Sequence, residues 1–164
     1  MRVYLPSTVA GLRSLLDSGS IAGPSTAFAV TAGLREWYVD GDVEELEYAA
    51  MLEASRASLR LLDAEPDVMR RRVVLAADVP DSAVRVRDDL DRGVVRLSES
   101  VPLALVASVH LDDVDAEPAV GAAAAAISAA DLGDAAAQDS VDDAEGYELS
   151  WYATQELEGV LAVL

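Results

Sequence analysis

One stretch constrains the fold more than any other, the segment from Val43 to Leu62. Its apolar residues recur at the spacing of an α-helix, about 100° per residue. They form one seam that continues round toward the opposite side: Val43, Leu46, Ala50, Ala54, Ala57, Leu61, Met51, Leu62, Leu59, Leu52 and Tyr48. The polar remainder covers roughly a third of the circumference. A helix that is apolar over so wide an arc is normally covered on two sides, so the sequence predicts a central helix.

The chain before this helix predicts alternating strands and helices. Arg2–Leu5 is strand-like and Pro6 is expected to end it, because proline cannot donate to a strand ladder. The other expected elements are a helix over Val9–Asp17, capped by Ser7 or Thr8 and followed by Gly19, a strand in TAFAVT, and a helix over Ala32–Val39.

The chain after this helix predicts strands first and helices later. RRRVVLAADV is apolar on both faces from Val73 to Ala77, so both faces should be covered. The other expected elements are a loop with a helical turn over Asp78–Asp91, a strand in VVRLS, a last strand over Ala107–Leu111, a helix over Pro118–Leu132, and a final helix from Asp142 and Asp143 to about Ala162. The acidic, Ala-rich segment 131–143 has little apolar area for docking and is expected to be a mobile loop.

Together these patterns predict one α+β domain spanning residues 1–164. We expect a mixed sheet of about four to five strands, with the central helix and the C-terminal helix packed against it. A chain of 164 residues suits a single domain of this kind.

Charge excludes several classes of function. Thirty acidic residues face twelve basic ones, every basic residue is arginine, and the last is Arg96. A general basic surface for nucleic acid or anionic membrane is therefore excluded. The acidity either keeps the protein soluble or serves a basic protein partner, cation binding or mimicry of the nucleic-acid backbone. No apolar run approaches a membrane span, no apolar signal region follows Met1, and there is no cysteine. We expect a cytoplasmic protein without disulfides or thiolate metal sites.

Carboxylates and aromatic residues supply the candidates for a cleft. Glu47 and Glu156 fall inside apolar helical arcs, where a buried carboxylate needs a partner, although an ion pair with an arginine would explain each of them. Two aromatic pairs lie on amphipathic segments, where core packing is the alternative to a shared cleft. The full candidate set is Arg2, Tyr4, Thr31, Trp37, Tyr38, Glu47, Trp151, Tyr152 and Glu156.

No motif identifies a reaction or a cofactor. The single histidine, His110, and Asp112 share one face of a strand by their spacing, which is half of a metal site at most. There is no Walker loop, GxGxxG, GxSxG or HExxH, and no visible cluster of arginines to offset phosphate charge. We therefore predict no catalytic residue, no cofactor and no metal.

Several strings resemble known families. LREWY, EELEYAAMLEASRASLRLL, VPLALVASVHLDD and ELSWYATQELEGVL, with RVYLP at the start, resemble an uncharacterised family of small actinobacterial proteins over nearly the whole chain. The order of VYLPSTVAGLRSLLDSGSI, AFAVT, RRVVLAADV and VRLSESVPLALVASV is similar to the layout of ADP-ribosyltransferases related to the tRNA 2′-phosphotransferase. That second resemblance implies an NAD site near the first strand, where Tyr4 and Leu5 stand in place of the family's His or Arg.

Three functions follow as hypotheses. The favoured one is a non-catalytic, acidic module that binds another protein or regulates it. The alternatives are an ADP-ribosyltransferase-like or other NAD-binding enzyme and a mimic of nucleic acid. A mimic needs its acidic residues in a double row on one rigid face.

Overall fold

Seven strands form one sheet in which every neighbouring pair is antiparallel. The computed structural model describes residues 1–164, and the strands lie in the spatial order β5-β6-β3-β1-β4-β8-β9. Their bounds are β1 (Arg2–Ser7), β3 (Ser25–Phe28), β4 (Val73–Asp78), β5 (Val84–Val86), β6 (Val94–Leu97), β8 (Val106–Leu111) and β9 (Ser150–Ala153). Two more strands, β2 (Ser20–Ile21) and β7 (Val101–Pro102), pair only with each other.

The α+β class is confirmed, but the predicted sheet is wrong in two respects. It has seven strands rather than four to five, and no pair is parallel. β5 lies in the segment expected to be a loop, and β9 lies inside the expected final helix. β1 also continues through Pro6, which stands opposite Val74, so proline does not end the strand.

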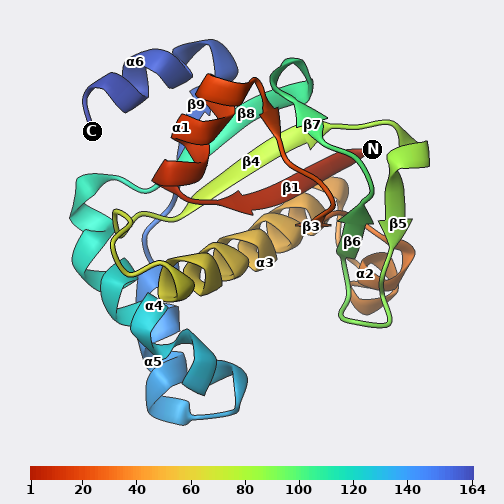
Figure 1. Ribbon diagram of the computed structural model, residues 1–164. Coiled ribbons are helices and arrows are strands. Elements are labelled where there is room, and N and C mark those ends of the chain that lie inside the picture. The colour runs from red at the N-terminus through yellow and green to blue at the C-terminus, as the bar shows by residue number, and fades with distance from the viewer.

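The chain has six helices, and helices lie on both sides of the sheet (Figure 1). Their bounds are α1 (Val9–Ser18), α2 (Ala32–Trp37), α3 (Val43–Ala64), α4 (Glu117–Asp131), α5 (Ala135–Glu145) and α6 (Leu157–Ala162). α1 and α6 lie on one side of the sheet, α3 lies on the other, and α4 and α5 lie beyond α3. Short 3₁₀ turns occur at Asp81–Ala83, Leu103–Leu105, Val114–Ala116 and Thr154–Glu156.

Local sequence explains where the first helices begin and end. The Thr8 hydroxyl accepts a hydrogen bond from the Gly11 N–H at 3.1 Å and caps α1. Gly19 ends that helix with a φ of 79°, which glycine adopts without steric cost. Asp42 caps α3 in the same way, through the Glu45 N–H at 2.9 Å.

The central helix is confirmed, and it is covered on two sides over only part of its length. Leu46, Ala50 and Ala54 pack on the sheet in one apolar cluster with Tyr4 and Phe28. Leu59 and Leu62 belong to a different cluster, which they share with buried residues of α4 and α5. The N-terminal half of α3 has no such second cover, and Val43 and Tyr48 are each 60% exposed.

The C-terminal third of the chain departs most from the sequence-based expectation. The segment expected to be a mobile loop holds most of α5, whose Val141 and Ala144 are buried beside the alanines of α4. Small side chains let the two helices approach closely. The mobility of residues 131–143 stays a prediction. The expected final helix is interrupted: its first residues end α5, its middle is β9, and only its last part forms a separate helix, α6, which packs Leu157 and Leu161 on the sheet.

Candidate binding groove between α3 and the β8–β9 edge

A groove runs along the N-terminal half of α3, on the side that faces β8 and β9. It consists of two adjoining hollows of about 190 and 260 Å³, which share Tyr48, Met51 and His110. The first is also lined by Leu52, Ser55, Arg72, Glu145, Tyr147, Glu148 and Leu149. The second is also lined by Arg2, Tyr4, Glu44, Glu47, Ala76, Ser108 and Trp151.

Strand pairing explains why residues so far apart in the sequence make one floor. Tyr4 stands opposite Ala76, Ala76 opposite Ser108, and His110 opposite Trp151. Residues that stand opposite each other on neighbouring strands share a face. The floor therefore joins β1, β4, β8 and β9, whereas the wall is a single stretch of α3.

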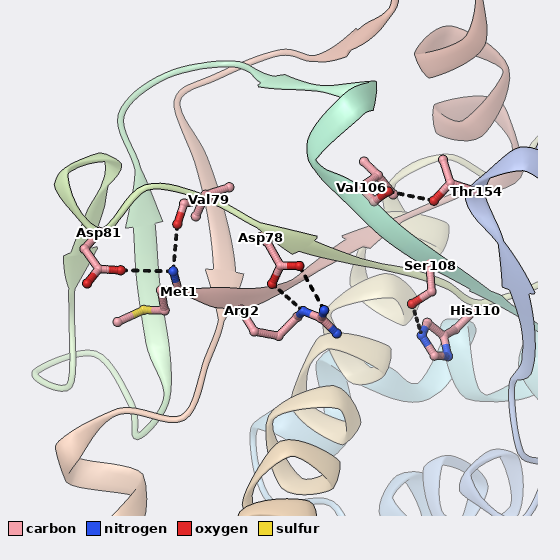
Figure 2. Close-up of polar contacts among 9 residues, drawn as sticks. All are labelled: Met1, Arg2, Asp78, Val79, Asp81, Val106, Ser108, His110 and Thr154. Atoms are coloured by element: carbon pink, nitrogen blue, oxygen red, sulfur yellow. Dashed lines mark hydrogen bonds and ion pairs between the residues drawn. The ribbon is translucent and has the colours of Figure 1, made fainter.

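Arg2 and Asp78 form an ion pair at one end of this floor (Figure 2). The Arg2 Nε and Nη2 atoms donate to the two Asp78 oxygens at 2.8 and 2.9 Å. This pair raises the pKa of Arg2 and lowers the pKa of Asp78 from their ordinary values. Burial, followed by the charge of Glu47, raises the pKa of Tyr4, so its phenol stays neutral at pH 7.

Ser108 and His110 lie side by side on β8 (Figure 2). The Ser108 Oγ is 3.0 Å from the His110 Nε2, and the tautomer of the ring decides which atom donates. Burial, helped by the nearby Arg2 charge, lowers the pKa of His110 to about 4, so the ring is neutral at pH 7. No carboxylate hydrogen-bonds to this imidazole. The pair therefore lacks the third group that orients the base in activated serine sites.

Arg72 closes the other end of the groove. Its guanidinium group is 2% exposed and donates to Asp112, which is fully buried, from Nε and Nη2 at 2.8 Å each. A further hydrogen bond of 2.7 Å from Nη2 to the Tyr147 carbonyl holds the segment between α5 and β9. Because Asp112 is bound by Arg72 and His110 by Ser108, the two residues do not form the half-site that their spacing suggested. No group of three or more His, Asp or Glu side chains lies close enough to hold a metal ion.

The groove has more carboxylates than arginines to neutralise them. Glu145 pairs with Arg56, and the two arginines of the lining are held by Asp78 and Asp112. Three lining carboxylates have no ion-pair partner: Glu44, Glu47 and Glu148. Two aromatic rings stand above them in solvent, since Tyr48 is 60% and Trp151 61% exposed. The groove therefore has negative charge, open aromatic faces and no free cation.

The comparisons with known proteins define the lineage. The chain matches the model of DUF6912, a family of unknown function, over residues 1–161. The chain belongs to this family. The predicted resemblance to an uncharacterised family is thereby confirmed, while its actinobacterial origin stays a prediction. No curated protein and no solved structure matches the chain. The DUF6912 family supplies no reaction or ligand, so the site has to be interpreted from its geometry.

The fold brings together four of the nine residues proposed as a cleft. Those in the groove are Arg2, Tyr4, Glu47 and Trp151. Three others lie around α2: Thr31 caps this helix and donates to Asp88, Trp37 lies under Arg92, and Tyr38 ends the helix. Tyr152 and Glu156 line a different hollow beside α6. Glu156 is exposed and accepts from the Ala153 N–H at 2.8 Å.

Sequence reasoning missed the residues that give the groove its character. Tyr48 was assigned to the apolar surface of α3, and Glu44, Ser108 and Glu148 were not singled out. One signal in the sequence was available for Glu44 and Tyr48, because residues at i and i+4 share one helical face with Met51 next to them.

None of the six helices combines the length and the apolar composition that a membrane-spanning helix needs.

Proposed function

We propose that the chain is a non-catalytic protein-binding module, and that its groove takes basic side chains of a partner protein. The observation that carries this proposal is the lining itself, where Glu44, Glu47 and Glu148 lack ion-pair partners beside the exposed rings of Tyr48 and Trp151. Guanidinium and ammonium groups bind carboxylates through charge-assisted hydrogen bonds and stack on aromatic faces.

The division of the groove into two hollows suits separate side chains. The hollows measure about 190 and 260 Å³, so each alone is below the range of about 300 to 1,000 Å³ that small-molecule sites occupy, while the two together fall inside it. Each hollow suits one long side chain. The candidate residues for an NAD site are divided between this groove and α2, so the same geometry gives the NAD-binding alternative little support.

The charge of the whole chain supports a basic partner. The net charge is −18, and no arginine follows Arg96. A field of one sign attracts an oppositely charged partner over several ångströms and raises the rate of association, more strongly at low salt. In the groove, this negative charge lies next to the exposed aromatic rings of Tyr48 and Trp151.

The test uses a peptide with one arginine flanked by glycine and serine, with a citrulline peptide as the uncharged counterpart. Binding is followed by the fluorescence of Trp151 in a Trp37→Phe background, because these are the only two tryptophans. We expect saturable binding of the arginine peptide and none of the citrulline peptide. Glu44→Gln/Glu47→Gln should weaken binding about tenfold, as expected from two lost charged contacts.

The matched control is Asp139→Asn/Glu158→Gln, which removes the same charge from exposed positions outside the groove. We expect it to weaken binding less than about twofold. Equal losses in both double variants, or equal binding of the citrulline peptide, would contradict the proposal, because only the overall charge or no charge at all would then matter.

A further inference from the structure

Most arginines that lack a carboxylate lie on two neighbouring elements, α2 and the β5–β6 hairpin. Six of the twelve arginines form ion pairs: Arg2, Arg56, Arg60, Arg71, Arg72 and Arg87. Four of the remaining six lie on α2 or on the β5–β6 hairpin: Arg35, Arg85, Arg92 and Arg96. α2 and the hairpin are in contact, since the Arg92 guanidinium carbon lies 3.6 Å from the centre of the Trp37 ring. In a chain with thirty carboxylates, this grouping calls for an explanation.

Two of these arginines stand directly opposite each other. Arg85 on β5 pairs in register with Arg96 on β6, and Arg96 pairs with Thr26 on β3. Residues in register share one face of the sheet, with Cβ atoms about 5 Å apart, and like charges in that position are destabilising. The Arg96 Nη1 donates to the Thr26 hydroxyl, which fixes that guanidinium group and leaves its other N–H groups free.

The carboxylates of the hairpin loop are already bound to other donors. Asp88 accepts from the Thr31 hydroxyl and from the N–H groups of Gly33 and Gly93. Asp89 binds Arg87 through both oxygens at 2.8 Å. Asp91 accepts from the Arg92 N–H at 2.7 Å. None of them forms an ion pair with Arg85 or Arg96.

We propose that Arg85 and Arg96 form a binding site for a phosphate group, either inorganic phosphate or a phosphate monoester. Arg85 and Arg96 stand in register on neighbouring strands, so both side chains can reach one dianion. Arginine binds phosphate oxygens through paired N–H donors. The bound anion removes the repulsion between the two side chains.

The strong negative charge of the chain does not prevent this binding. β5 and β9 are the opposite edges of the seven-stranded sheet. The groove floor begins at β1, three strand spacings from β5, so its nearest part lies roughly 14 Å from the Arg85 edge. This distance exceeds the Debye length of about 8 Å at physiological salt.

The test measures thermal unfolding in phosphate, with chloride and acetate at the same ionic strength. Fifty millimolar phosphate should raise Tm by about 3 °C if Kd is about 5 mM. Arg85→Gln should lose most of that rise. The control is Arg13→Gln, which removes one charge from an exposed arginine without an ion pair on α1 and should keep the full rise. Without phosphate and at low salt, Arg85→Gln should unfold about 1 °C higher than the natural chain, because the repulsion is gone.

A second measurement does not depend on stability. In a phosphate titration followed by NMR, the side-chain Nε–Hε signals of Arg85 and Arg96 should shift with one common Kd, while that of Arg13 should not. Equal Tm shifts in all three proteins would reveal a general salt effect and overturn the proposal. Equal effects of acetate and phosphate would also overturn it, because the site would then select charge and not the phosphate group.

Discussion

The two halves of α3 are built from the same kind of sequence and have different surroundings. In the C-terminal half, Leu59 is 1% exposed and Leu62 is fully buried, because α4 and α5 cover the side that the sheet leaves open. In the N-terminal half, Tyr48 is 60% exposed and the corresponding side borders the groove. A wide apolar arc therefore does not distinguish a helix that is covered on two sides from one that is covered on one side.

The difference shows what a candidate site adds to a fold. Where α3 is covered, its apolar residues stabilise the domain. Where it is not covered, Glu44 and Glu47 interrupt the apolar surface and face the sheet floor. The carboxylates make this uncovered half polar, and under the proposed function they select a partner of positive charge.

The largest expected effect concerns the buried ion pair between Arg72 and Asp112. Arg72→Met should destabilise the chain by about 3 to 5 kcal/mol, since it removes the counter-ion of the buried Asp112 and leaves only the residue 72 backbone N–H as its donor. Arg72→Met/Asp112→Leu should recover much of the loss. Arg60→Met, which breaks an exposed pair with Asp131, is the control and should cost at most about 1 kcal/mol. Equal losses in urea unfolding for the Arg72 and Arg60 variants would contradict the buried role.

The next prediction compares the two halves directly. Leu59→Ala should cost about 2 to 5 kcal/mol, because it leaves a cavity between α3 and α4. Tyr48→Ala should cost less than about 1 kcal/mol, because the ring is already in solvent. A cost for Leu59→Ala below about 1 kcal/mol would mean that α4 does not cover the helix in solution.

The pH dependence of stability tests whether water is excluded from His110, in the floor of the groove beside the N-terminal half of α3. The pKa of His110 in the folded chain is about 4, below its ordinary value of 6.5. The unfolded chain therefore binds the proton first, and stability is lost as pH falls from about 6.5 to about 4, by up to about 3 kcal/mol. His110→Gln should lack this component. An NMR titration that gives His110 a pKa near 6.5 would show that water fills the groove.

The smallest effect concerns the helices that form the cover. Residues 131–143 are rich in alanine and bury little apolar area, so they should open more readily than the core of α3. We expect their amides to exchange at least about tenfold faster than those from Ala54 to Leu62. This stretch should also be the first internal site of limited proteolysis. Protection as strong as that of α3 would mean that α4 and α5 are fixed parts of the core.

The sequence predicts elements whose stabilisation is local. The Thr8 cap, Gly19 and the apolar periodicity were sufficient for α1, and the long periodicity of Val43–Leu62 was sufficient for α3. β9 could not be predicted in this way. Its Trp151 is held by pairing with His110, forty-one positions earlier, while its own residues also suit a helix. Strand pairing at that range leaves no periodic signal in a short segment.

The sequence predicts several residues of the groove but does not predict which of them lie together. Arg2, Tyr4, Glu47 and Trp151 were chosen because charged and aromatic residues on apolar segments require an explanation. Their grouping with Thr31, Trp37 and Tyr38 assumed that the second strand borders the cleft. The strand order instead places β4 and β8 on the groove side of β1, and β3 on the other side.

Ser58 fixes the rotation of α3 about its own axis relative to the sheet. Its hydroxyl donates to the Ser7 carbonyl at 2.7 Å and accepts from the Val73 N–H at 3.1 Å, so one small side chain joins α3 to two strands. A roll of the helix by one residue, about 100°, would break both bonds and carry Glu47 and Tyr48 away from the sheet. Eleven residues separate Ser58 from Glu47, or about 16 Å along the helix axis. The composition of the groove is thus set at a distance, by a hydroxyl that does not line it.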